Sequence, residues 1–110
     1  LKETLDALIH FSSRDPKMET GCLFYKMRAG KHRLGPQTLE RINEIDAVAV
    51  DTFAAYLEQC RLSGDWESEQ PSSAMARYLV EQIGLAFTQR AAGENPTHVQ
   101  RSISIALSVF

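Results

Sequence analysis

Apolar residues recur at intervals of three and four along most of the chain, which is the pattern of helices that bury one face. The pattern predicts five helices, over residues 1–12, 20–29, 36–63, 72–92 and 96–110. No stretch alternates between apolar and polar residues as a half-buried strand would. We therefore predict an all-α fold in a single domain over residues 1–110, a length that is typical of one domain.

Residues that start or stop helices stand at the ends of these segments. Pro36 and Pro96 suit a first helical turn, and Asn95 is a predicted cap for the last helix. Thr20 is the predicted cap of the short second helix. Three glycines are predicted to end helices in a left-handed conformation: Gly30, Gly64 and Gly93.

Two helices carry more apolar surface than one core needs. In the helix over 72–92, the residues Arg77, Glu81 and Thr88 form a polar arc of only about 40°. The last helix is apolar over roughly 200°. The short helix over 20–29 is also apolar on almost every side, and we expect it to be well buried.

The two C-terminal helices are joined by a short turn, so they are predicted to be antiparallel neighbours. Their excess apolar surface predicts a homodimer, in which a four-helix bundle forms about a two-fold axis. The alternative is that the same residues cover the chain's own core. The residues predicted for this interface are Tyr78, Gln82, Leu85, Gln89, Ile103, Leu107 and Phe110.

Composition narrows the class of protein. Hydrophobic residues make up 44% and charged residues 24%, as in ordinary globular chains. The net charge of −2 argues against an autonomous nucleic-acid-binding domain. Apolar runs are far shorter than the ~20 residues that span a membrane, so no membrane partner is expected. Cys22 and Cys60 lie far apart and indicate a reducing, cytoplasmic setting, with a disulfide as the less favoured alternative.

The chain shows no catalytic motif and no spacing of metal ligands. We therefore expect no enzymatic activity, no cofactor and no metal, with the three histidines at the surface or at helix ends. The segment "KMRAGKHR" (26–33) is rich in basic residues. We expect it to be a solvated loop rather than a phosphate site, because no aromatic residues are interleaved with its charges.

Aromatic residues from three helices are predicted to line a ligand cavity, with plain core packing as the alternative. Tyr25 and Tyr56 are the expected polar contacts, because a buried hydroxyl needs a hydrogen-bond partner. Asp46 falls inside the apolar stripe of the long helix, where a carboxylate must be paired. It is predicted to contact either a ligand or a partner arginine. The full candidate set is Phe24, Tyr25, Asp46, Phe53, Tyr56 and Phe87.

Three segments then follow one another in a recognisable order: "GCLFYKMRAG", a long helix ending in "LEQCRLSGD", and the stretch from "SSAMARYLVEQIGLAFTQRAAG" to the C-terminus. This order resembles the C-terminal domain of TetR-family transcriptional regulators over roughly residues 15–110, and residues 1–12 match the preceding family helix in position. Lys26 departs from the family pattern, in which many members have asparagine. The matching residues are Gly21, Cys22, Leu23, Ala76, Arg77, Leu79, Gly84, Leu85, Arg90, Ala91, Ala92 and Gly93.

The resemblance implies a regulatory domain that binds a small, often apolar effector between its helices and dimerises through its last two helices. Operator DNA would be bound by an N-terminal helix-turn-helix domain, and effector binding would release it. The helical pattern already runs at Leu1 without an initiator methionine, so we expect that domain to be missing from these 110 residues. The predicted function is effector sensing and dimerisation in a TetR-like repressor. The alternative is a helical homodimerisation module without a ligand.

Overall fold

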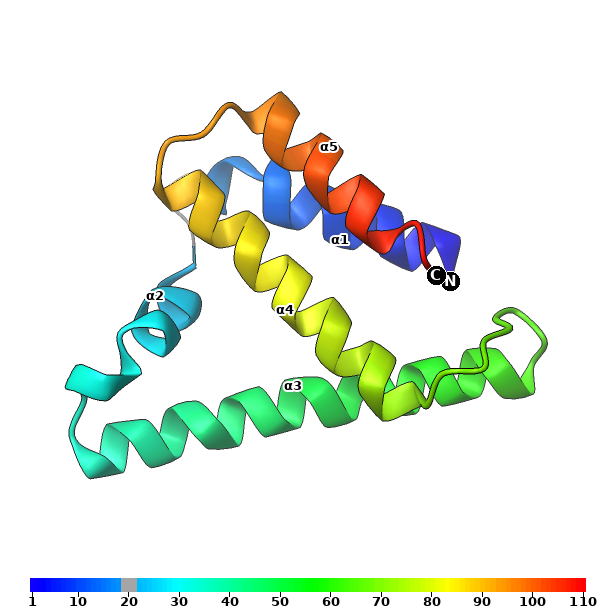
Figure 1. The fold of residues 1–110 in the computed structure, drawn as a ribbon, viewed down its shortest axis with the longest axis horizontal. Coiled ribbons are helices and arrows are strands. Elements are labelled where there is room, and N and C mark those ends of the chain that lie inside the picture. Colours follow the sequence, from blue (N-terminus) through cyan, green and yellow to red (C-terminus); the bar gives the residue numbers. More distant parts are fainter. Residues whose placement is uncertain (19–21) are drawn as a thin grey trace.

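The computed structural model describes residues 1–18 and 22–110, and these form a wholly helical structure (Figure 1). Two short 3-10 helices, Pro16–Met18 and Lys31–Arg33, flank the second α-helix. The described residues contain no strand, so the prediction of an all-α fold is confirmed. The five α-helices are α1 (Lys2–Ser13), α2 (Leu23–Ala29), α3 (Pro36–Leu62), α4 (Ser72–Ala91) and α5 (Pro96–Leu107).

α4 is the central helix of the fold. α1 and α5 pack against each other and against α4, while α3 crosses α4 on its other side (Figure 1). α5 runs back beside α4 after a short turn, as predicted for antiparallel neighbours. α2 is a short helix whose main contacts among the described elements are with α4 and α3. It lies at the edge of the fold, toward the N-terminal end of α3.

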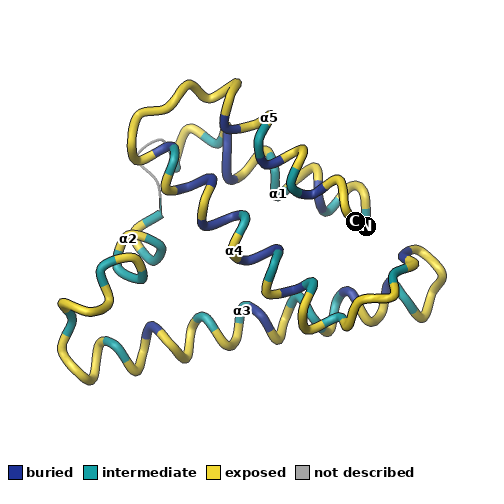
Figure 2. Tube along the Cα trace, in the orientation of Figure 1, coloured by how far each residue is buried: buried dark blue, intermediate teal, exposed yellow. Residues whose placement is uncertain are grey.

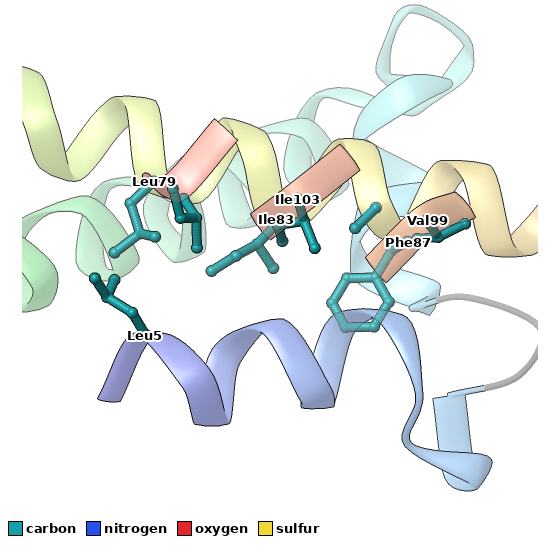
Figure 3. Packing of buried hydrophobic residues seen from close by; sticks show 8 residues of the cluster. Leu5, Leu79, Ile83, Phe87, Val99 and Ile103 are labelled. Atoms are coloured by element: carbon teal, nitrogen blue, oxygen red, sulfur yellow. The ribbon is translucent and has the colours of Figure 1, made fainter. Parts of the chain in front are cut away.

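Two hydrophobic clusters lie on different sides of α4. The cluster between α1, α4 and α5 is shown in Figure 3 and consists of Leu5, Leu79, Ile83, Ala86, Phe87, Val99, Ile103 and Leu107. The cluster between α3, α4 and the loop that joins them consists of Val50, Leu57, Cys60, Trp66, Ala76 and Val80. α4 contributes to both clusters. Much of the broad apolar arc of α4 is therefore buried by other helices of the same chain, and a second copy is not required to cover it.

The predicted helix starts agree with the structure wherever it describes them. Pro36 and Pro96 begin α3 and α5. The side chain of Asn95 caps α5 by accepting a hydrogen bond of 2.8 Å from the backbone N–H of Thr97. The predicted cap of the short helix, Thr20, lies outside the described residues.

The predicted helix ends are confirmed at two of three glycines. Gly64 and Gly93 have φ angles of 81° and 79°, in the left-handed region that glycine occupies without steric cost. Gly30 has a φ of −98°, so the prediction of a left-handed conformation is wrong there. The chain passes from α2 directly into the 3-10 helix Lys31–Arg33, and this continuation keeps the backbone right-handed.

Arg61 organises the loop between α3 and α4. Its guanidinium donates to the carbonyl oxygens of Ser68 and, over 2.7 Å, of Gln70. The same group lies 4.6 Å from the ring centre of Trp66, whose side chain is buried in the cluster beneath. These contacts fix the direction in which α4 leaves α3.

Candidate functional site

The candidate site lies where α2 rests on α4. The sequence pattern predicts a buried α2, and this prediction is wrong: none of its residues is fully buried, and Leu23 is 71% exposed (Figure 2). The helix is apolar on most sides, and among the described elements its main neighbours are α3 and α4. Among the residues of α2, Tyr25 contacts α4 and Arg28 contacts α3.

The ring of Tyr25 lies directly on the backbone of α4 at Gly84. A Cβ atom at Gly84 would stand 2.8 Å from both Cδ1 and Cε1 of the tyrosine ring, closer than real Cβ contacts. The ring also stacks on Phe87, with ring centres 5.5 Å apart and planes 26° apart. The hydroxyl of Tyr25 donates to the carbonyl oxygen of Val80 over 3.5 Å. We call the surface of α4 formed by Val80, Gly84 and Phe87 the Gly84 slot.

The predicted aromatic cluster is only partly brought together. Phe24 lies edge-on to Tyr25, with ring centres 5.3 Å apart, so Phe24, Tyr25 and Phe87 form one group. Tyr56 lies elsewhere, against the cluster between α3 and α4, with its hydroxyl 2.7 Å from Oγ1 of Thr4. Phe53 packs against both clusters.

Phe11 is an aromatic neighbour that the sequence pattern did not single out. Its ring meets Phe87 edge-on, with centres 5.3 Å apart. Phe11 lies on the apolar side of α1, but the sequence does not reveal that this side meets Phe87 of a helix some seventy residues later. The contact therefore depends on how α1 packs against α4.

Two hollows flank the ring of Tyr25, each of about 240 Å³. Both are lined by Tyr25, Ala29 and Thr88. The first hollow is also lined by Arg28, Lys31, Glu81, Gly84 and Leu85. The second is also lined by Cys22, Lys26, Phe87 and Ala91. Neither hollow includes Phe53 or Tyr56, so the predicted ligand residues are not the walls of a single cavity.

Asp46 lies between two arginines. Its Oδ1 is 3.4 Å from Nε of Arg28 on α2, and its Oδ2 is 3.6 Å from Nη1 of Arg77 on α4. These separations are those of ion pairs rather than of short hydrogen bonds. The alternative that Asp46 has a partner arginine is confirmed, whereas a contact with a ligand stays a prediction. The carboxylate connects α2, α3 and α4.

The pH dependence of stability should report the burial of Tyr25. Burial raises the pKa of this hydroxyl from 10 to about 12. Between these values the folded chain keeps a proton that the unfolded chain has lost, so the free energy of unfolding should fall as the pH rises from 10 to 12. Below pH 10 the group should make no pH-dependent contribution.

Tyr25→Phe removes this titration and keeps the ring. We expect urea unfolding at pH 8 and pH 11 to show a smaller loss of stability for the variant than for the native chain. The deprotonation of lysines affects the stability of both proteins, so its effect cancels when the two losses are compared. Equal losses would mean that the hydroxyl of Tyr25 is solvated in the folded state.

Part of the predicted dimer interface is buried within the chain itself. Ile103 and Leu107 are each 3% exposed and belong to the core between α1, α4 and α5, so their prediction as interface residues is wrong. The reason is that α1 covers this side of α5. Phe110 is half-buried against Trp66 and Tyr78, with ring centres 6.3 Å away in each case.

A different side of α5 faces outward, beside the strip that was predicted on α4. The hydroxyl of Tyr78 donates to the carbonyl oxygen of Ala106 over 2.5 Å, so this end of the strip is used within the chain. Gln82, Leu85 and Gln89 line a shallow pit together with Ser102 of α5. We call this surface the α4–α5 face, and it consists of Gln82, Leu85, Gln89, Ser102, Ile105 and Val109. Leu85 is 50% exposed, and Ile105 and Val109 are 67% and 61% exposed.

The described residues contain no group of three or more histidine, cysteine, aspartate or glutamate side chains that could hold a metal ion. Both cysteines are free, with Cys60 buried and Cys22 half-buried. Within the same part of the chain, every helix falls short of the length and apolar character that crossing a membrane requires.

Comparison of the chain with models of protein families, with curated proteins and with solved structures finds no match. The likeness to TetR-family regulators therefore remains an expectation based on motif order.

Proposed function

We propose that this chain is the effector-sensing and dimerisation domain of a TetR-like transcriptional repressor. Three observations support the proposal: the order of the sequence motifs, the order of five helices with a short second and a long third, and the apolar surface that the last two helices turn outward. The α4–α5 face carries the proposal, because a dimer of this kind needs an exposed, self-complementary surface on consecutive helices.

The proposed dimer joins two α4–α5 faces about a two-fold axis. Leu85 of α4 lies beside Ser102 of α5, and Leu85, Ile105 and Val109 are each at least half exposed. Contiguous exposed apolar side chains on a monomer mark interaction surfaces, whereas single ones need no explanation. Gln82 and Gln89 would supply hydrogen bonds at the edge of the apolar contact.

The proposed mechanism is allosteric. An effector held by α2, α3 and α4 changes the spacing of the two copies, and operator DNA is bound by the helix-turn-helix domain that the family carries on the N-terminal side. The effector shifts this equilibrium only if it binds the DNA-releasing arrangement more tightly than the DNA-binding one.

Sedimentation equilibrium tests the dimer directly. At tens of micromolar we expect a single species with twice the chain mass of 12.3 kDa. A monomer at that concentration would contradict the proposal. The measurement should be made at two ionic strengths, because an interface of apolar and amide side chains should lose little affinity in salt.

A homodimerisation module without an effector is the second candidate. Two observations favour it, because they engage predicted ligand residues within the chain itself. Phe53 packs against both hydrophobic clusters, and the hydroxyl of Tyr56 forms a hydrogen bond with that of Thr4. A thermal-shift screen with apolar compounds separates the two functions, because a ligand that binds only the folded state raises the melting temperature.

A further inference from the structure

We propose that the Gly84 slot is a binding site for a planar aromatic carboxylate, whose ring takes the place of the Tyr25 ring. The inference rests on the proposed function, because it names the class of effector and the place where the effector binds. In the structure the chain's own tyrosine ring occupies the site, so Tyr25 acts as an internal competitor.

The slot has the shape of a flat ring. Glycine is disfavoured relative to alanine inside a helix, and Gly84 lies near the middle of α4. Its lack of a side chain lets the ring of Tyr25 lie against the helix backbone, with Phe87 stacked on the ring. A saturated ring is thicker than an aromatic one, so the slot selects a planar ligand.

Tyr25 is held loosely enough to leave. Its hydrogen bond to Val80 is long, at 3.5 Å, and α2 contains no fully buried residue. An ion pair between Arg28 and Asp46, at 3.4 Å, also holds α2. Segments with few buried contacts open at a lower free energy than the core does. Release of the ring uncovers one face of Phe87, which the ring of the ligand would then cover.

Removal of the ring joins the two hollows. Tyr25, Ala29 and Thr88 line both of them, so the tyrosine side chain is a wall that the two hollows share. Each hollow alone, at about 240 Å³, is smaller than the roughly 300–1,000 Å³ of typical ligand pockets. The joined space would fall within that range, with Gly84 of the first hollow among its lining residues.

The charges around the joined space favour an anion. Lys26, Arg28 and Lys31 line the two hollows, and Glu81 is the acidic residue among the lining side chains. Among the described residues, Arg28 forms a salt bridge with Asp46, whereas Lys26 and Lys31 form none. Carboxylates form their strongest hydrogen bonds with such cations. The ring of the ligand would stack on Phe87 while its carboxylate meets a lysine.

The probe for this proposal is benzoate, compared with benzamide, which lacks the charge, and cyclohexanecarboxylate, which lacks the planar ring. Binding is measured by calorimetry and by the melting temperature. We expect benzoate to bind the native chain and the two analogues to bind at least about tenfold more weakly. Tyr25→Ala should bind benzoate at least about tenfold more tightly than the native chain, because the competing ring is gone.

Gly84→Ala places a methyl group in the slot and should abolish benzoate binding. Because that methyl also clashes with Tyr25, the decisive variant is Tyr25→Ala combined with Gly84→Ala, which fills the slot without the clash. Gly35→Ala is the matched control, since a Cβ there meets nothing within 4 Å, and it should bind like the native chain.

Three results would overturn the inference. They are binding that survives in the double variant, binding to Tyr25→Ala but not to the native chain, and equal binding of benzoate and benzamide.

Failure of the proposed function would give different results. A monomeric chain that binds benzoate only when Gly84 is present would keep the slot and overturn the dimer. An apolar compound that stabilises the double variant as much as the native chain would keep effector sensing and overturn the slot.

Discussion

Replacement of Phe87 by alanine should lower the free energy of unfolding by about 3–5 kcal/mol, the range found for the truncation of buried aromatic residues. Phe87 is 1% exposed, and its ring lies nearly perpendicular to that of Phe11 and stacks on that of Tyr25. Its removal leaves a cavity at the point where α1, α2 and α4 meet. Urea unfolding followed by far-ultraviolet circular dichroism measures the loss.

Phe11→Ala is the matched control for Phe87→Ala. Phe11 is 41% exposed and makes the edge contact with Phe87. Its truncation should cost about 1–2 kcal/mol, because part of the ring is in water and the aromatic pair itself contributes only about 0.5–1.5 kcal/mol. Equal losses for the two variants would show that Phe87 is not at the centre of this packing.

Leu85→Arg should convert the proposed dimer into folded monomers. At a two-fold interface each substitution acts twice, so two guanidinium groups of like charge would be brought into one apolar contact. We expect the dissociation constant to rise at least about 100-fold, as for a central interface residue. Sedimentation equilibrium measures this change, and circular dichroism checks that the helix content is retained.

Two further variants make this experiment specific. Ile105→Arg alters the same face from α5, where the side chain is 67% exposed, and should also dissociate the dimer. Val48→Arg places the same charge on the outer side of α3, where the side chain is 64% exposed, and should leave the dimer intact. If Leu85→Arg unfolds the chain, Leu85 belongs to the core. If the dimer survives both Leu85→Arg and Ile105→Arg, the interface lies elsewhere.

Helix positions are largely readable from this sequence because their signals are local. The spacing of apolar residues and the Asn95–Pro96 cap lie within one or two turns of the helix ends that they define. Gly30 shows the limit of such signals: glycine permits a left-handed conformation, but the following 3-10 helix decides that the conformation is not used.

The surroundings of a helix are harder to predict, because they depend on distant segments. The apolar faces of α2 and α5 are visible in the sequence, but not which neighbours cover them. α1 covers the side of α5 that carries Ile103 and Leu107, whereas Leu23 on α2 is 71% exposed. The same limit applies to Asp46: the sequence shows that it needs a partner, and only the fold brings Arg28 and Arg77 to it from two other helices.

Gly84 and Leu85 are consecutive residues of α4, so the slot and the α4–α5 face share one helical turn. Leu85 even lines the hollow that contains Arg28. A ligand at the slot and a second copy at the face would therefore act on the same few residues, and their binding free energies would be linked. Such linkage is reciprocal: if benzoate changes the dimerisation constant by some factor, dimerisation changes the affinity for benzoate by the same factor. The affinity measured for benzoate should then depend on the concentration of the protein itself.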